Sequence, residues 1–268
     1  MSRGNWEERE AWRGALAGLT RGAPTATMLA PLKTTTSGSR AFLVVANDRQ
    51  QYWVKVPGNP QGEIMMATEV IVAAVGNIIG APVRPTTLLQ IPPALVGWKY
   101  GPTDWVRPGT AHASLHLAGT EESNQTGDLA YVKRDHNSTR QPAILALWDL
   151  CMGGDAQWLY DQTREHSVWS FDHGLWLGGD PDWSGDILEP IVGMDWRWIG
   201  PIAGMSAEAF LEMSVRVSAI SVGEVMTAVA AVPVDWNIQE WDLETVAWLV
   251  YNRRLGVSNR LVEFAMSL

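Results

Sequence analysis

The chain has 268 residues, of which 46% are hydrophobic, and a formal net charge of −9. This composition excludes wholesale disorder, and the acidic balance argues against a broad basic surface, so we expect no nucleic-acid partner. The single cysteine, Cys151, excludes an internal disulfide and a cysteine-cluster zinc site, and the lack of a signal-peptide core or long apolar run predicts a cytoplasmic protein with no membrane partner.

Small, hydroxyl-bearing residues form the first informative segment. The run from Thr34 to Ser39 leads into an apolar stretch at 41–46, which predicts a strand, and Asn47-Asp48 predicts a turn. A loop of this kind can lay backbone N–H groups and hydroxyls against phosphate oxygens, although such runs are also ordinary loops. The residues predicted to contact phosphate are Thr36, Ser37, Gly38 and Ser39.

A lysine and a glutamate follow on two successive elements. Residues 51–56 alternate between apolar and polar types, which predicts a strand that carries Lys55. Residues 64–79 are long enough for a helix that ends at Gly80, and this helix carries Glu69. A strand lysine can pair with a glutamate of the next helix and direct its ammonium group at nucleotide phosphates. The alternatives are a solvated strand lysine and a locally paired glutamate.

The stretch at 111–117 is predicted to be the strand that closes a small lobe, with a hinge at 118–120. Residues 124–139 are polar and unpatterned, which is typical of a connector. His112 and His116 are expected to be strand surface residues, because no third metal ligand stands at a recognisable spacing.

Two acidic positions complete a pattern. Asp155 lies in a loop after an apolar helix, and Asp172-His173-Gly174 ends the strand-like run at 167–171. In a kinase, one such carboxylate steers the proton of the nucleophile and the other holds Mg²⁺. The tripeptide alone is typical of a turn. The order of loop, Lys55, Glu69, Asp155 and Asp172 is what favours an ATP-binding site.

Fifteen tryptophans stand against four phenylalanines. Filling of large core gaps is the favoured interpretation, and stacking on a ligand or partner is the alternative. Trp196 and Trp198 alternate along the chain and are the two expected to contact a partner. A Trp-rich binding protein without a nucleotide site is therefore a competing hypothesis.

The last third of the sequence predicts helices. Ser206 is a predicted N-cap, and Ser221 with Glu224 has the capping-box pattern. Two further helices are predicted at 243–255 and 258–266.

The ordered motifs resemble those of HipA-like kinases, a compact branch of the protein-kinase-like fold that includes bacterial toxin kinases. The matching pieces are Tyr52 to Pro60, Thr68 to Val83, Trp148 to Asp155 and Trp169 to Gly174. The resemblance implies that Lys55 binds ATP, that Glu69 orients Lys55, that Asp155 is catalytic and that Asp172 binds the metal.

The loop after Asp155 departs from the pattern of this family. Ala156 and Tyr160 stand where family members tend to have an arginine and a metal-binding asparagine. Asp161 or Gln162 could supply the missing oxygen, and Asp161 is the better candidate because carboxylates suit Mg²⁺. If neither reaches the metal, the chain would be a nucleotide-binding pseudokinase that acts through protein interaction.

The sequence thus predicts an α+β, two-lobed protein-kinase-like fold, with a β-rich lobe at 1–118 and a mainly helical lobe at 119–268. The predicted function is transfer of the γ-phosphoryl group of ATP, with Mg²⁺, to a serine or threonine of a protein. A regulatory protein partner, as in toxin-antitoxin pairs, fits the resemblance.

Overall fold

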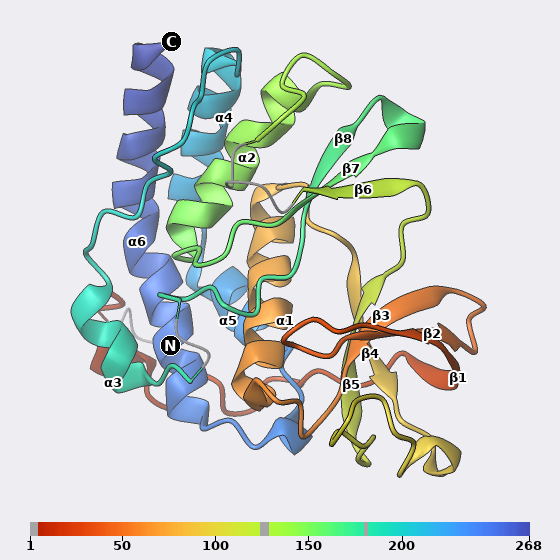
Figure 1. Ribbon diagram of the computed structural model, residues 1–268. Helices are drawn as coiled ribbons and strands as arrows, with labels where there is room; N and C mark the ends of the chain where they lie inside the picture. The colour runs from red at the N-terminus through yellow and green to blue at the C-terminus, as the bar shows by residue number, and fades with distance from the viewer. Residues whose placement is uncertain (1–4, 124–128, 180–181) are drawn as a thin grey trace.

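The computed structural model describes residues 5–123, 129–179 and 182–268, and it has two lobes (Figure 1). The small lobe is a closed barrel with strand order β1-β2-β3-β5-β4, in which all pairs are antiparallel except β1 with β4. Its strands are β1 (Ala26–Thr34), β2 (Phe42–Ala46), β3 (Gln51–Lys55), β4 (Thr86–Gln90) and β5 (Thr110–Leu115).

The barrel has a hydrophobic core of its own. Alternating residues of the strands point inward, so that Val44, Val54 and Ala113 are buried with Met28 and Phe42. On β3 and β5 the opposite positions, which include Lys55 and His112, line the cavity between the lobes. The barrel therefore holds Lys55, at the end of β3, at the junction of the lobes.

Helix α1 (Gly62–Ile79) lies between the barrel and the other helices (Figure 1). It ends at Gly80, whose φ of +73° is the left-handed conformation common after a helix. Gly76 allows a close approach, because a Cβ there would lie 2.4 Å from a side-chain carbon of Val83. In length and composition α1 could span a membrane, but two thirds of it is buried within the molecule, as expected for a core helix.

A second sheet lies where the sequence predicted a mainly helical lobe. Its order is β6 (Thr120–Ser123), β7 (Trp158–Asp161) and β8 (Ser167–Ser170), and both pairs are antiparallel. The sequence predicted β8 as the strand-like run at 167–171, whereas β6 and β7 are only four residues long and periodicity did not reveal them. The sheet forms the side of the cleft opposite the barrel.

The helices of the large lobe pack on one another beside α1. They are α2 (Asn137–Leu150), α3 (Gly185–Leu188), α4 (Ala207–Ser218), α5 (Val222–Ala230) and α6 (Glu240–Ser267), with short 3₁₀ turns η1 (Arg9–Trp12), η3 (Gln162–Arg164), η4 (Glu189–Ile191) and η5 (Val234–Trp236). A further 3₁₀ turn, η2 (Pro93–Leu95), belongs to the barrel, where it lies between β4 and β5. The predicted caps are confirmed, because Ser206 accepts from the N–H of Ala209 and Ser221 forms a capping box with Glu224. The two helices predicted after residue 243 are one continuous helix, α6.

Most of the segment before β1 packs with the large lobe, and the chain reaches the barrel at Thr25, whose N–H donates to the carbonyl of Leu88 in β4. Trp12 and Leu16 are buried in the core that the helices share. Glu244 of α6 accepts the backbone N–H of Leu16 at 2.9 Å, and the indole of Trp248 donates to the carbonyl of Glu7 at 2.9 Å. The first lobe is thus smaller than the range 1–118 expected from the sequence.

Candidate active site

Lys55, Glu69 and Asp172 meet at the centre of the cleft. The Nζ of Lys55 lies 2.5 Å from Glu69 Oε1 and 2.5 Å from Asp172 Oδ1. Strand β3 supplies the lysine, α1 supplies the glutamate, and the turn after β8 supplies the aspartate. Lys55 and Glu69 are only 6% and 2% exposed. The structure therefore brings together three residues that are far apart in the sequence.

Burial and charge act on these groups in opposite directions. Burial disfavours the ammonium of Lys55, but the carboxylates of Asp172 and Glu69 outweigh it and raise the pKa of Lys55. Burial likewise opposes ionisation of Glu69, but Lys55, with His112 and His173, brings the pKa of Glu69 well below its usual value. Burial and the charge of Glu69 raise the pKa of Asp172 despite Lys55. Asp172 is thus the carboxylate that is easier to protonate.

The backbone of the Asp172 turn is held in an unusual conformation. Asp172 has a φ of +55°, in the left-handed region that residues other than glycine rarely adopt and that is found at functional sites. Glu69 Oε2 accepts the backbone N–H of His173 at 3.0 Å, so one carboxylate binds both the lysine and this turn. Gly174 is required by packing, because a Cβ there would lie 2.3 Å from Met65 Cγ.

The hydroxyl-rich loop between β1 and β2 covers the cleft. Asn59 Nδ2 donates to the carbonyl of Ser39 at 2.6 Å, which ties the loop to the segment before α1. Ser37, Gly38 and Ser39 line a cavity of about 350 Å³ that Asp155 and Asp172 also line. Thr36, which was predicted to contact phosphate, is exposed and does not line it, whereas Thr35 lines the adjoining cavity.

Tryptophans hold the loop of Asp155. The indole of Trp176 donates to the carbonyl of Asp155 at 3.0 Å, and that of Trp196 donates to the carbonyl of Gly153 at 2.8 Å. Trp198, expected to contact a partner, is 7% exposed and packs edge to face on Trp148. Trp196, which is half-buried, therefore supports the loop of Asp155, and Trp198 belongs to the core beside it.

Asp161 does not face Asp172, contrary to the expectation from the sequence. It pairs with Ser167 at the turn of the β7–β8 hairpin, whereas Asp172 follows the other end of β8. Its Oδ1 accepts the N–H and the hydroxyl of Thr163, which is a capping role. The side chain that lies beside Asp155 is Gln157, whose Nε2 donates to Asp155 Oδ2 at 2.7 Å and which lines the same cavity. The loop spacing assumed from the family resemblance indicated Asp161, so the sequence analysis did not identify Gln157.

An adjoining cavity of about 290 Å³ contains residues that sequence reasoning missed. Arg84 is 7% exposed, and its Nε donates to the carbonyl of Leu115 at 2.6 Å. His112, expected at the surface, is 1% exposed, and its ring nitrogens have no partner among the described residues. The pairing of His112 with Lys55 across β5 and β3 explains the difference, because both side chains point into the cleft. Burial lowers the pKa of His112 to about 4.

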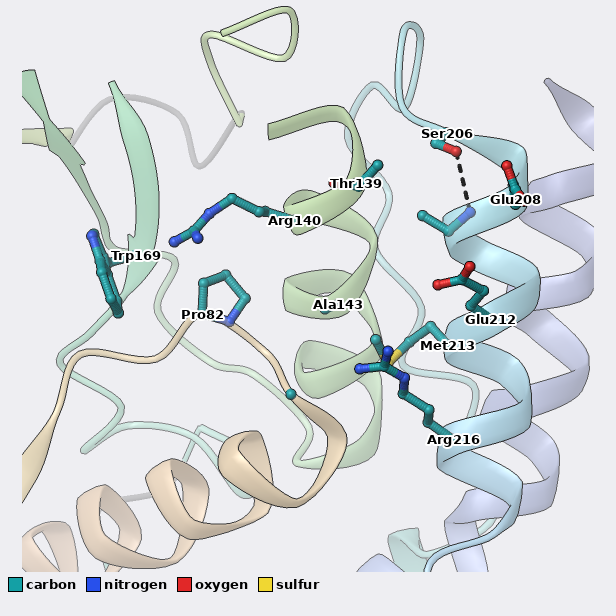
Figure 2. Close-up of a pocket in the computed structure, with 12 residues that line it drawn as sticks. Pro82, Thr139, Arg140, Ala143, Trp169, Ser206, Glu208, Glu212, Met213 and Arg216 are labelled. Atoms are coloured by element: carbon teal, nitrogen blue, oxygen red, sulfur yellow. Dashed lines mark hydrogen bonds between the residues drawn. The ribbon is translucent and has the colours of Figure 1, made fainter. Parts of the chain in front are cut away.

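A separate cavity of about 330 Å³ lies between α2 and α4 (Figure 2). Arg140 of α2 points toward Trp169 on one side, and Glu212 and Arg216 of α4 lie on the other. None of the predicted site residues lines this cavity. Apart from Thr36 and Asp161, the predicted residues line the cleft between the lobes.

Comparison with known proteins shows which solved structures have a similar fold. No family model matches the chain, and no curated protein matches it by sequence. The crystal structure of CtkA, a proinflammatory kinase from Helicobacter pylori, aligns with a TM-score of 0.59 at 11% identity, over 93% of this chain and 99% of that one. Two structures of the Golgi casein kinase, one with Mn/ADP bound, give TM-scores of 0.46 and 0.47 at 10% identity, over 96% and 97% of this chain and 76% and 77% of theirs. The similarity to CtkA concerns the fold, and the chain has a two-lobed, protein-kinase-like α+β fold.

Proposed function

We propose that the chain is a kinase that transfers the γ-phosphoryl group of a nucleoside triphosphate to a hydroxyl group. The observation that carries this proposal is the contact of Lys55 with both Glu69 and Asp172, beside a cavity that Asp155 also lines. A lysine that pairs with a helix glutamate next to a hydroxyl-rich loop is suited to bind phosphates.

The proposed reaction is a displacement at the γ-phosphorus. The acceptor oxygen forms a bond to phosphorus while the bond to the β–γ bridging oxygen breaks, and the nucleoside diphosphate leaves. Asp155 receives the proton of the acceptor hydroxyl. Lys55 and the backbone of residues 37–39 hold the phosphates, so catalysis comes mainly from positioning and neutralised charge.

The residues present fit a divalent metal only together with a nucleotide. The described part of the chain has no group of three His, Cys, Asp or Glu side chains that could hold a metal. Mg²⁺ is commonly bound by one or two carboxylates plus phosphate oxygens. Asp172 would be the carboxylate ligand, and Gln157 is better placed than Asp161 to add an oxygen. The metal would neutralise phosphate charge.

The HipA-like resemblance supports a more specific proposal for the donor, the acceptor and the partner. It proposes ATP as the donor, a serine or threonine of a protein as the acceptor, and a regulatory protein as a partner. The similarity to CtkA supports a protein-kinase-like fold for this proposal.

A nucleotide-binding pseudokinase is the second candidate. The observation that favours it is Tyr160, which stands at the expected asparagine position, is buried, and accepts the backbone N–H of Ala130 at 2.8 Å. The Trp-rich binding hypothesis is weaker, because Trp105, 53% exposed, is the one exposed tryptophan of the described residues.

Nucleotide binding and transfer of a labelled γ-phosphate test the proposal. Lys55→Ala should fold and bind nucleotide more weakly by about 1–3 kcal/mol, as for a lost charged hydrogen bond. Lys133→Ala, which removes an exposed lysine, is the control and should bind normally. Asp155→Ala should bind nucleotide but lose transfer. Equal nucleotide affinity of Lys55→Ala and the wild type would overturn the proposal. A wild type that binds nucleotide but labels no protein would favour the pseudokinase.

A further inference from the structure

A small hairpin, residues 97–106, lies between β4 and β5, and the proposed chemistry gives it no role. The N–H of Tyr100 donates to the carbonyl of Asp104 at 3.0 Å, and Lys99 pairs with Trp105 in an antiparallel bridge. Successive residues of such a hairpin point to opposite faces. Tyr100 is accordingly buried in the barrel core, whereas Lys99 and Trp105 are exposed. One face of the hairpin thus packs on the barrel.

This inner face packs at the end of the hydroxyl-rich loop. Phe42, which begins β2 directly after the loop, is 1% exposed. Its ring lies 5.2 Å from the ring of Trp98 and 5.1 Å from that of Tyr100. Phe42 also pairs with Thr34, the last residue of β1 before the loop. The hairpin therefore packs where the loop joins the barrel.

A charged contact links the hairpin to the loop itself. The Nε of Arg40 lies 3.7 Å from Asp104 Oδ2, and the two side chains are 31% and 13% exposed. Arg40 has a φ of +50°, in the left-handed region that an arginine rarely adopts. Its backbone N–H donates to the carbonyl of Ser37 at 3.0 Å, which closes a turn over residues 37–40. Asp104 thus binds the residue whose unusual conformation completes this turn.

The turn is the part of the loop that lines the catalytic cavity. Ser37, Gly38 and Ser39 line it together with Asp155 and Asp172. The backbone N–H groups of a turn can bind phosphate oxygens only if the turn keeps one position relative to the rest of the site. A partly exposed ion pair contributes little to the stability of a fold. Loss of the pair should therefore affect the position of the turn and not the stability of the barrel.

We infer that Asp104 is a positioning residue for the triphosphate of the nucleotide. It acts through Arg40, which it holds in the conformation that closes the turn at residues 37–40. The inference rests on the proposed function, since that function gives the backbone of residues 37–39 the role of holding the phosphates.

Asp104→Asn keeps the size of the side chain and removes its charge. Calorimetric titration with a non-hydrolysable ATP analogue should show an affinity about two- to fivefold lower than that of the wild type, as for a lost partly exposed ion pair. The affinity for adenosine, which has no phosphates, and the midpoint of urea unfolding should stay unchanged. Asp104→Glu keeps the charge and should restore most of the affinity for the ATP analogue.

A second variant tests whether Asp104 acts through Arg40. Arg40→Gln should lower the affinity for the ATP analogue by a similar factor, and the double variant should lose no more than either single variant, because the two residues form one contact. Asp48→Asn is the matched control. Asp48 lies in the turn at the opposite end of β2, where its Oδ2 accepts the hydroxyl of Tyr52 at 2.7 Å. It should leave the affinity for the ATP analogue unchanged.

The outcomes separate the inference from the proposed function. Unchanged affinity for the ATP analogue in Asp104→Asn, with weaker binding in Lys55→Ala, would overturn the inference alone. Additive losses in the double variant, or an equal loss of affinity for adenosine, would also overturn it. A wild type that does not bind the ATP analogue would overturn both the inference and the proposed function.

Discussion

Two buried ion clusters hold this molecule together, and they differ in what surrounds them. In the cleft, Lys55 binds Glu69 and Asp172 beside open cavities. In the large lobe, Asp149 of α2 binds Arg253 at 2.8 Å and Arg260 at 2.6 Å, both from α6.

The difference lies in unused hydrogen-bonding capacity. Arg253 also donates to the carbonyls of Asp149, Val192 and Met194, so its guanidinium is fully engaged by the protein. The cleft cluster instead has a carboxylate with a raised pKa, Asp172, on a strained backbone. Buried ion pairs alone are weak evidence for either stability or function. An open cavity next to the pair is what indicates a ligand.

Removal of one cation from each cluster should have the largest effect on stability, and it tests most directly whether the two clusters differ. Arg253→Met leaves the buried Asp149 carboxylate with Arg260 alone and leaves the carbonyls of Val192 and Met194 without the donor that Arg253 supplies, so it should cost about 3–5 kcal/mol of the free energy of unfolding. Lys55→Met should cost less than Arg253→Met, because water and a proton can reach Asp172 and Glu69 from the cavity that both line. Urea unfolding of both variants measures this. Equal losses would mean that the two clusters are equally structural.

Acid should act on the cleft cluster through its histidines. Burial lowers the pKa of both His112 and His173 to about 4, with Glu69 opposing the shift, whereas an unfolded histidine has a pKa of about 6.5. Between these values the unfolded chain binds more protons, so the stabilisation is complete above about pH 6.5 and is lost as the pH falls toward 4. Each histidine should contribute up to about 3 kcal/mol to this loss.

Urea unfolding at about pH 7 and about pH 5 checks this prediction. His112→Asn should reduce the pH dependence, whereas Arg253→Met should keep it, because the ion pairs of Asp149 contain no histidine. An unchanged slope in His112→Asn would show that this ring is not the group that titrates.

The smallest effect concerns Trp176, which links the two clusters. Its ring contacts Trp148, the neighbour of Asp149, at 5.3 Å and His173 at 4.7 Å, and its indole binds the loop of Asp155. Trp176→Phe should cost about 1 kcal/mol of stability for the lost hydrogen bond. The rate of phosphoryl transfer should fall further than nucleotide affinity, because the loop is displaced.

Trp183→Phe is the matched control for this variant. The indole of Trp183 donates to the hydroxyl of Thr68 at 2.8 Å in the core, away from the loop. Its loss should cost similar stability and leave the transfer rate unchanged. The same loss of rate in both variants would mean that Trp176 has no special role in positioning Asp155.

Elements with strong local signals could be predicted from the sequence. The strand that carries Lys55 was predicted from its alternation of apolar and polar residues, and the helix that carries Glu69 from its length and its stop at Gly80. The prediction of Asp161 was wrong because it assumed a loop spacing, whereas residues 158–161 form a strand that carries Asp161 to the hairpin turn. Arg84 gave no signal, since only the tertiary structure shows that it is buried and forms no ion pair with a described residue.

The attachment of the first residues to α6 has a consequence for how the chain is made. Trp12 and Leu16 leave the ribosome before the barrel, but their packing partners on α6 are synthesised only after it. The barrel has its own core and can fold as a unit inside the interrupted large lobe, whereas the large lobe cannot be completed until α6 emerges. Contacts of such sequence separation slow folding, so the nascent large lobe should expose apolar surface that chaperones recognise.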